Sequence, residues 1–320
     1  SHNSLAHRTT WLRSDLMNNV DSSLSGYLNI ALFAIDFRGE GSDYSAENSD
    51  TIIVASINND TKQVKLTSVY RDTLLDVGEG SYQKANAAYA YGGPEQALSM
   101  LNTNLDLQLT EYATVDFNAL ATTIDLLGGL DVPLSYAEIV FMNDYCIETS
   151  EVTGKDYTPI ELPAEKPEDE DADLGTYHLN GVQATSYCRI RYTAGLDFKR
   201  SERQREIIQM MVAKAKKSSL STLFSIMDQV FPMIQTSLDK QEIVSMIPNM
   251  LSYEIGETAG FPFDHYEMQV SQKGDVVVPV TLESNVQQLH EFLFDDSSYT
   301  PSVEVQDKSS QITSITGLGI

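Results

Sequence analysis

The sequence predicts an α/β fold in which a central mixed β-sheet is sandwiched between helices. Two observations support this prediction. The continuous apolar run Leu28–Ile35 is typical of a strand buried on both faces. Farther along the chain, strand-like and helix-like patterns alternate, as they do in mixed α/β layers. With 320 residues, 42% of them hydrophobic, the chain is long enough to enclose a sizeable core.

A β-hairpin is expected beside the first strand. The runs TIIVASI (residues 51–57) and VKLTSV (residues 64–69) flank the polar, turn-rich segment NNDTKQ. Because a hairpin brings the chain back to the edge of the sheet where it began, Asp50 and Arg71 should be neighbours. The polar loop after Asp36 should return to that edge too, since connections in compact domains are local. We therefore expect Asp36, Asp50 and Arg71 to converge.

The rest of the chain alternates between helices and strands. Pro94 stands at the first position of a predicted helix that extends to Leu105. Gly128 and Gly129 close a further predicted helix. The other predicted elements are strands over residues 112–117, 137–142, 186–192 and 275–280, and helices over residues 118–130, 219–238 and 241–253 and from near Ser201 onward.

Some segments are not expected to contribute to the core. The segment ELPAEKPEDEDADL, residues 161–174, holds seven acids, one Lys and two Pro, so we expect a mobile surface loop. No run of about 18 apolar residues is present, so no membrane-spanning helix is predicted. The predicted organisation is a lead segment in residues 1–26, a single domain in residues 27–297 with its core motifs in 27–217 and C-terminal helices and a strand in 218–297, and a flexible tail in residues 298–320.

The chain is strongly acidic, since 46 Asp and Glu against 21 Lys and Arg give a formal net charge of -25. This charge argues against nucleic acid as a partner, because phosphate backbones are held by basic surfaces. Six of the Lys and Arg residues nevertheless lie between Ser186 and Arg205. Such a concentration of cations indicates a site for an anion. The alternative is a set of surface ion pairs with nearby Asp and Glu, which stabilise a fold only weakly.

The arrangement of these cations suits a phosphate-rich ligand. In a strand, Arg189 and Arg191 would share one face, and paired guanidinium groups bind ligands with many oxygens. Ser201 and Gln204 have the S-x-x-Q spacing of a capping box, which predicts a helix N-terminus where phosphate binds readily. The residues expected around this anion are Arg189, Arg191, Arg200, Arg203 and Gln204.

Two converging carboxylates near an arginine add a candidate metal site. Asp36 and Asp50 can hold Mg²⁺, whose remaining positions take water and phosphate oxygens. Alternatively, both acids only form turns or caps. Lys84 and Asn86 are further polar candidates, unless they only cap a loop. No HExxH or CxxC pattern supports zinc, and no Walker A, GxGxxG or GxSxG motif supports the corresponding enzyme classes.

Taken in order, these segments resemble the LytR-CpsA-Psr (LCP) family of cell-wall glycopolymer transferases. The resemblance extends from about Tyr27 to Lys217 through the blocks NIALFAIDFR, NSDTIIVASIN, LTSVYRDT, KANAAYAYGG, VDFNALATTIDLLGGLDV, LNGVQATSYCRIRY and DFKRSERQR. It implies an α/β/α catalytic domain with an apolar tunnel for a polyprenyl chain. Residues 220–253 would line this tunnel, unless their apolar side chains are ordinary core.

The resemblance also implies an activity and a location. Family members are thought to move a glycopolymer phosphate, such as teichoic acid or capsule, from an undecaprenyl-pyrophosphate carrier onto peptidoglycan with Mg²⁺. The domain would be extracytoplasmic, in a mainly Gram-positive envelope, and anchored in the cell membrane by a single N-terminal helix that this sequence lacks. The alternatives are a polyprenyl-pyrophosphate phosphatase and a non-catalytic regulator of the envelope that binds a lipid pyrophosphate.

The resemblance assigns roles to individual residues. Asp36 and Asp50 match the acids linked to the metal. The residues assigned to the pyrophosphate are Arg38, Arg71, Lys84, Arg189, Arg191, Arg200, Arg203 and Gln204, and those assigned to catalysis are Asp36, Arg71, Arg189 and Arg191. Asp197 also lies in a matching motif. Asn48 departs from the family, which commonly has Arg there, so one phosphate-binding cation is missing and Arg38 would take a larger share.

Cys146 and Cys188 are the two cysteines of the chain. In the extracytoplasmic setting that the resemblance implies, we expect a disulfide bond between them, which would stiffen the surroundings of the arginines. Two independent buried thiols are the alternative.

Overall fold

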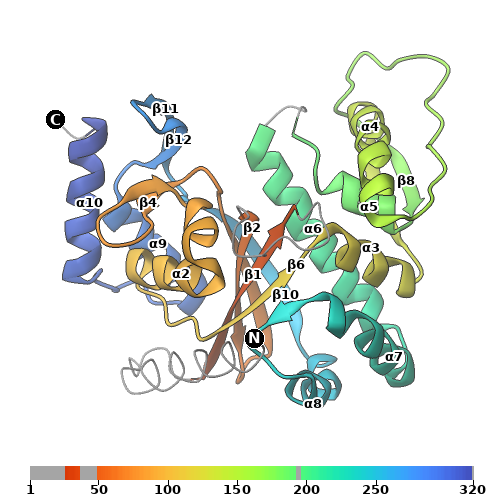
Figure 1. Ribbon diagram of the computed structural model, residues 1–320, viewed down its shortest axis with the longest axis horizontal. Coiled ribbons are helices and arrows are strands. Elements are labelled where there is room, and N and C mark those ends of the chain that lie inside the picture. The colour runs from red at the N-terminus through yellow and green to blue at the C-terminus, as the bar shows by residue number, and fades with distance from the viewer. Residues whose placement is uncertain (1–25, 37–48, 192–195, 319–320) are drawn as a thin grey trace. The chain divides into compact units, whose positions relative to one another are not determined.

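A computed structural model of the chain describes residues 26–36, 49–191 and 196–318 (Figure 1). The chain divides into two compact units. The first, which we call the sheet unit, comprises Ser1–Thr114, Thr236–Asp239 and Ser252–Ile320. The second, which we call the helical unit, comprises Val115–Gln235 and Lys240–Leu251. Each unit is described by itself.

The sheet unit contains a six-stranded mixed sheet with the strand order β10-β3-β2-β1-β6-β9. Its strands are β1 (Tyr27–Ile35), β2 (Ser49–Asn58), β3 (Gln63–Val69), β6 (Glu111–Val115), β9 (Gln235–Thr236) and β10 (Glu254–Phe261). The strands β1, β2 and β3 are successively antiparallel, whereas β10 lies parallel to β3. The predicted first strand, hairpin and mixed sheet are therefore confirmed.

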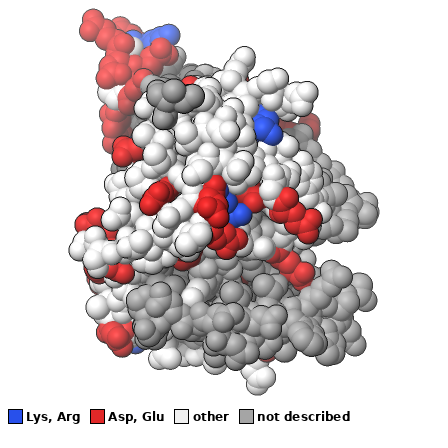
Figure 2. Space-filling view, turned by 90° about the vertical axis from the view of Figure 1, so that its left-hand side faces the viewer, with Lys and Arg blue, Asp and Glu red and all other residues white. Residues whose placement is uncertain are grey.

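The surface of the molecule reflects the acidic composition. Figure 2 shows Asp and Glu spread over one face, with few Lys and Arg among them. Anions therefore meet a repulsive field over this face, and the cations that could bind them must be found at particular places.

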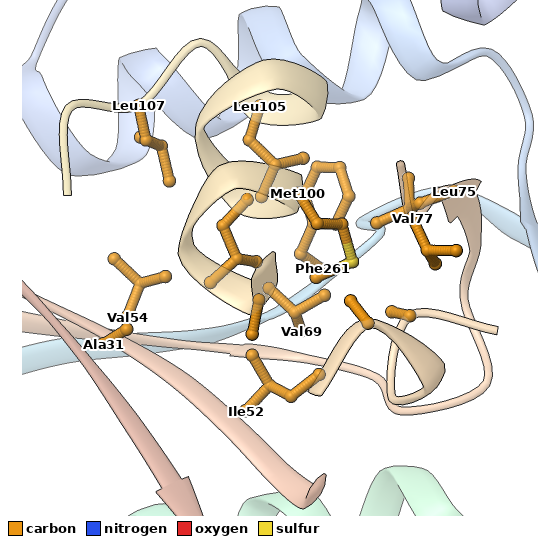
Figure 3. Packing of buried hydrophobic residues seen from close by; sticks show 14 of the residues in the cluster. Ala31, Ile52, Val54, Val69, Leu75, Val77, Met100, Leu105, Leu107 and Phe261 are labelled. Carbon is orange, nitrogen blue, oxygen red and sulfur yellow. The ribbon is translucent and has the colours of Figure 1, made fainter. Parts of the chain in front are cut away.

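The main core lies between this sheet and the helices α2 (Ala87–Leu105), α9 (Leu282–Phe294) and α10 (Val303–Thr316), which Figure 1 shows on the same side of the sheet. Figure 3 shows Ile52, Val54 and Val69 of the sheet facing Met100 and Leu105 of α2. The first strand alternates between buried and half-buried residues, so it is buried completely on one face only, not on both as predicted.

Helix α2 contains the predicted helix and a turn before it. The backbone leaves helical geometry at Gly92 and Gly93, and Gly93 has a φ of 69°. Pro94 then begins the segment up to Leu105, as predicted, because proline fits the first position of a helix. A glycine at position 93 provides the positive φ that the break requires.

The C-terminal segment forms a helix, α10, where the sequence predicts a flexible tail. Ser302 caps it by accepting a hydrogen bond from the backbone N–H of Val305. Asp106 holds the start of the helix, accepting hydrogen bonds from the backbone and the hydroxyl of Ser302 and from the hydroxyl of Tyr299. Val305 and Ile312 are buried. Because these anchors come from distant sequence, the weak apolar pattern of the segment did not indicate them.

The sheet unit also contains two small antiparallel ribbons. One pairs β4 (Leu74–Asp76) with β5 (Tyr82–Lys84), and the other pairs β11 (His265–Val270) with β12 (Gly274–Pro279). The last of these confirms the strand predicted over residues 275–280.

The helical unit has its own core and packs helices around a two-stranded ribbon. Its elements are α3 (Phe117–Leu126), β7 (Leu130–Ser135), α4 (Tyr136–Thr153), β8 (Asp173–Leu179), α5 (Gly181–Tyr187), α6 (Leu196–Lys216), α7 (Leu220–Val230), the 3-10 turn η3 (Phe231–Met233) and α8 (Lys240–Met250). The helix predicted before Gly128 and Gly129 is confirmed as α3. The acidic segment between α4 and β8 is mostly exposed and lacks regular structure, and its mobility stays a prediction.

Two segments predicted as strands have other structures among the described residues of the helical unit. Residues 137–142 belong to α4, because Ser135 and Glu138 form a capping box that starts a helix there. In the segment predicted to begin a strand at Ser186, Ser186 and Tyr187 end α5, which starts from a second capping box at Asn180, and residues 188–191 form a turn and an irregular stretch. Gly181 allows that helix to lie directly against α3, because a Cβ atom at this position would come within 2.0 Å of the Ala121 carbonyl oxygen.

Two predicted helix boundaries are also wrong. Helix α6 begins at Leu196, so Ser201 lies inside it and not at a free N-terminus. Asp197 occupies its first turn, where a carboxylate interacts favourably with the helix dipole. The helix predicted over residues 219–238 ends at Val230, because Pro232 follows in η3 and cannot continue it. Among the described residues, no helix is both long and apolar enough to cross a membrane.

Candidate functional site

A β-bulge places two acids at one end of the hairpin in the sheet unit. Ala34 pairs with Thr51, and Ile35 pairs with Ser49, so Asp50 is the extra residue on β2. Bulges interrupt a ladder and redirect a side chain. Asp36 follows β1 directly and lies at the same end of this strand pair. The prediction that Asp36 and Asp50 share an edge of the sheet is confirmed.

Arg71 reaches this edge from the turn after β3. The turn is closed by a hydrogen bond from the Thr73 N–H to the Tyr70 carbonyl, and the Arg71 carbonyl accepts one from the Asn86 N–H. The Nη1 atom of Arg71 lies 2.5 Å from Oδ1 of Asp50. The predicted proximity of Asp50 and Arg71 is therefore confirmed.

Asp72 is a member of the site that sequence reasoning missed. Its Oδ1 atom lies 3.5 Å from Nε of Arg71 and 3.6 Å from Nζ of Lys84 on β5. The signal was its position directly after Arg71, in the block LTSVYRDT. The Arg71 and Lys84 side chains keep 22% and 33% of their surface exposed, so both remain accessible to an anion. We call Asp36, Asp50, Arg71, Asp72 and Lys84 the edge cluster.

The edge cluster has the composition of a magnesium phosphate site. Among the residues that the structure describes, no three His, Cys, Asp or Glu side chains gather in a way that could hold a metal ion. Mg²⁺ needs fewer, because it keeps several waters and binds through one or two carboxylates together with substrate phosphates. The pair Asp36 and Asp50 at one end of the hairpin fits this requirement. Magnesium itself stays a prediction.

In the helical unit, the predicted anion-binding residues surround the turn that follows α5. We call this set the turn cluster; it consists of Arg189, Arg191, Arg200, Arg203 and Gln204. Arg189 donates to Oε2 of Glu148 at 2.8 Å and to Oγ1 of Thr149 at 3.0 Å. Its guanidinium carbon lies 4.4 Å from the ring centroid of Phe117 and 5.2 Å from that of Tyr145. These contacts hold the guanidinium group in one place.

Arg191 and Arg200 share one carboxylate. Asp197 lies 3.2 Å from Nε of Arg191 through its Oδ1 atom, and Nη2 of Arg191 donates to Oδ2 at 3.4 Å. The same Oδ1 atom lies 3.5 Å from Nε of Arg200. Arg191 keeps 39% of its side chain exposed, whereas Arg200 is buried. Of these two arginines, Arg191 is therefore the one presented to solvent.

Arg203 is buried, and the half-exposed Gln204 next to it also contacts the turn. Nε of Arg203 lies 2.7 Å from Oε2 of Glu138, and its Nη1 donates to the Ile190 carbonyl at 3.2 Å. Nε2 of Gln204 donates to the Cys188 carbonyl at 3.2 Å. Both side chains therefore contact the backbone of the turn that carries the other arginines.

Acids that the sequence analysis did not single out complete the turn cluster. Glu138 pairs with Arg203 and Glu148 with Arg189, each from helix α4. No local pattern could have indicated them, because they lie more than forty residues before their partners. The alternative expectation, that these cations pair with nearby acids, holds for all four arginines of the turn cluster. Arg38 and Asn48 lie outside the described residues, so their roles stay predictions.

The cysteines and the apolar helices also have defined places. Cys146 and Cys188 are free, so the predicted disulfide bond is wrong. Burial raises the pKa of Cys146 to about 11 and that of Cys188 to about 12, so both thiols are protonated and unreactive at neutral pH. Ile226 and Val230 of α7 pack with Leu127 in a small core. The apolar tunnel stays a prediction.

Comparison with known proteins gives a family. The model of the LytR_cpsA_psr family matches residues 2–276. The chain is 30% identical over 213 residues to the polyisoprenyl-teichoic acid–peptidoglycan teichoic acid transferase TagU of Enterococcus faecalis, covering 66% of this chain and 61% of that protein. It is also 30% identical over 216 residues to biofilm regulatory protein A of Streptococcus mutans, covering 64% and 48%. The chain thus spans only about half to three fifths of these relatives.

A solved structure supports the fold. The crystal structure of protein gbs0355 from Streptococcus agalactiae matches with a TM-score of 0.67 and 26% sequence identity, covering 89% of this chain and 94% of that one. This similarity agrees with the α/β fold that the sequence predicts.

Proposed function

Because the chain belongs to the LytR-CpsA-Psr family, we propose that it transfers a glycopolymer phosphate from a polyprenyl-pyrophosphate carrier onto peptidoglycan. The name of the Enterococcus faecalis relative, a polyisoprenyl-teichoic acid–peptidoglycan teichoic acid transferase, supports the substrate classes. Its match covers 61% of that relative, and the family model covers most of the present chain.

The observation that carries the proposal is the edge cluster. In a protein with a net charge of -25, two accessible cations, Arg71 and Lys84, are held by the carboxylates of Asp50 and Asp72. Phosphoryl transfer needs positioning and neutralisation of charge more than covalent help from the protein. The cluster offers both kinds of group within one unit.

In the proposed reaction, a hydroxyl of the acceptor sugar attacks the phosphorus atom that bears the glycan. The bond from that phosphorus to the bridging oxygen breaks, and polyprenyl phosphate leaves with the bridging oxygen and takes up the proton that the hydroxyl loses. Arg71 and Lys84 would bind the phosphate oxygens and stabilise the charge that grows on the leaving group. Mg²⁺ held by Asp36 and Asp50 would supply further neutralisation of phosphate charge. In the turn cluster, Arg191 is the proposed contact to an anionic part of the substrate, because its side chain is the most exposed of the four arginines.

A mass-spectrometric transfer assay tests the proposal. The chain is incubated with a short-chain prenyl-pyrophosphate glycan, a peptidoglycan oligosaccharide and Mg²⁺, and each component is omitted in turn. We expect a glycan phosphate on the acceptor only when all three are present. Release of prenyl phosphate without the acceptor would instead identify a phosphatase.

A regulator is the second candidate, because one relative is named biofilm regulatory protein A. Such a protein would bind the lipid pyrophosphate without turning it over. Binding of the prenyl pyrophosphate with neither transfer nor hydrolysis, over a panel of glycans, would favour this alternative.

We also propose that the chain acts outside the cytoplasm, attached to the cell membrane by a segment that precedes it. The substrates assigned to the relatives are cell-wall polymers, which supports this location. Protease accessibility of the full-length protein in intact cells would test it, with a cytoplasmic protein as the control.

A further inference from the structure

Arg203 is enclosed in a way that leaves it little access to a ligand. Its side chain is only 1% exposed. Nε faces the carboxylate of Glu138 at 2.7 Å, Nη1 donates to the Ile190 carbonyl at 3.2 Å, and the guanidinium carbon lies 5.8 Å from the ring centroid of Tyr187. Both ends of the planar donor group are therefore used inside the protein.

The next residue of α6 makes a parallel contact. Gln204 donates from Nε2 to the Cys188 carbonyl at 3.2 Å. The two accepting carbonyls, of Cys188 and Ile190, lie on either side of Arg189 in the chain. The Ile190 carbonyl also directly precedes Arg191. Helix α6 thus fixes the peptide groups that carry both arginines of the turn.

Glu138 connects this arrangement to a third helix. Its Oε1 atom accepts a hydrogen bond from the Ser135 N–H at 3.0 Å, and Oε2 faces Arg203. One carboxylate therefore caps α4 and neutralises the buried guanidinium group. Because a buried charge without its partner is strongly unfavourable, the loss of either member would release the other from its position.

From these contacts we propose that Arg203 and Glu138 are positioning residues. They hold the turn so that Arg191 meets the anion, and they do not themselves contact the pyrophosphate. This inference rests on the proposed function for the identity of the anion. It replaces the ligand role that the family resemblance implies for Arg203.

The sign of one substitution separates the two roles. If Arg203 contacted the anion, Glu138→Gln would remove a competing negative charge and free the guanidinium group, so anion binding would become tighter. If Glu138 positions Arg203, the same substitution loosens the turn and binding becomes weaker. Glutamine retains an oxygen for the Ser135 N–H, so the start of α4 keeps its cap.

The experiment measures binding of inorganic pyrophosphate to the whole chain by calorimetry, at a temperature where each variant is folded by circular dichroism. We expect Glu138→Gln and Arg203→Lys each to weaken binding by about tenfold, because neither keeps the charged, two-ended contact. Glu202→Gln is the matched control, since Glu202 is exposed on α6 and pairs with Lys199.

Hydrogen exchange provides a readout that needs no ligand. In the peptide covering residues 186–191, Glu138→Gln and Arg203→Lys should exchange faster than the wild type, whereas Glu202→Gln should not. Unchanged exchange in this peptide, or pyrophosphate binding by Glu138→Gln as tight as in the wild type, would overturn the positioning role. Glycan transfer is measured in parallel, so that an absence of transfer beside the expected binding and exchange pattern rejects the proposed function and not the positioning role.

Discussion

Arg71 contacts the side chains of two acids, Asp50 and Asp72, and still has part of its guanidinium surface exposed. Its backbone is fixed as well, since its carbonyl accepts a hydrogen bond from the Asn86 N–H. A cation held in this way does not have to reorganise when an anion arrives, and preorganised charge is what stabilises a transition state. We therefore expect substitutions of Arg71 and of its neighbour Asp72 to change turnover.

We predict that Arg71→Ala lowers kcat/KM for glycan transfer by about a hundredfold or more while the fold is retained, because a partly exposed cation is removed from the phosphates. Asp72→Asn keeps the shape of the side chain but loses the charge that holds Arg71 and Lys84 together, so its kcat should fall by about tenfold with a smaller change in KM. Steady-state kinetics and circular dichroism check both variants. Lys65→Ala, on the same sheet but away from the edge cluster, is the control. Wild-type turnover in Arg71→Ala would exclude the edge cluster as the site of the reaction.

His290 makes the stability of the sheet unit depend on pH. Burial lowers the pKa of its imidazole from 6.5, against smaller opposing effects of the Leu105 carbonyl and of Asp106. Below its unfolded-state pKa of about 6.5, His290 binds more protons in the unfolded chain than in the native one. The stability that the neutral imidazole contributes is therefore present above about pH 6.5 and is lost as the pH falls. Between about pH 7.5 and pH 5.5, the unfolding temperature of the wild type should therefore fall more than that of His290→Gln. Equal losses would mean that His290 does not titrate between these values.

At the scale of elements, the sequence predicted the strands and turns that depend on residues adjacent to them in the chain. The strands β1, β2 and β3 have apolar patterns and a short polar connection, so the hairpin and the proximity of Asp50 and Arg71 followed from geometry. The segment after Asn180 did not follow in this way. Its β-like spacing of two arginines competed with a capping box and with a contact between Gly181 and α3, and only the folded chain supplies that contact.

The same limit explains the residues that were missed. Glu138 lies in a segment of α4 that the sequence suggested to be a strand, Glu148 lies farther along the same helix, and each meets its arginine across a large sequence separation. Asp72 could have been identified from the sequence, because it directly follows Arg71. Pairing of charges between distant segments is decided by tertiary packing, which local propensity does not encode.

Helix α10 yields a prediction about an element. Asp106 ends α2 with a positive φ of 51° and accepts three hydrogen bonds from Tyr299 and Ser302. Asp106→Ala should lower the free energy of unfolding by about 2 to 4 kcal/mol, because three hydrogen-bonding groups lose a charged acceptor and alanine is less suited to this φ. Hydrogen exchange should increase most in residues 303–316. Ser310→Ala on the exposed face of α10 is the control, and protection of α10 that survives Asp106→Ala would refute this anchoring role.

At the scale of the whole molecule, the surface charge opposes the proposed substrate. The net charge of -25 repels an anionic carrier at long range, while the cations of the two clusters act only at short range. Salt shortens the reach of charge, from about 30 Å at 0.01 M to about 8 Å at 0.15 M. The chain therefore differs from most anion-binding proteins, in which salt weakens an attractive field.

We predict that the association rate of a short-chain prenyl pyrophosphate rises between about 0.01 M and about 0.15 M salt at constant Mg²⁺, and falls again at still higher salt as the local contacts are screened. Stopped-flow fluorescence with a labelled lipid measures this rate. A neutral prenyl alcohol with the same label is the control. A rate that only decreases with salt would show that the fields of Arg71, Lys84 and Arg191 dominate the approach.

The bulge at Asp50 separates the part of β2 that can change from the part that cannot. Because the extra residue stands at the start of the strand, residues 51–58 keep their register and their buried face whatever side chain occupies position 50. A substitution at this position therefore changes the chemistry of the edge cluster without repacking the interior, whereas an exchange at Ile52 or Val54 alters the core directly. The interior of the sheet places no demand on the side chain at position 50, so chemistry and not packing decides which residue stands there.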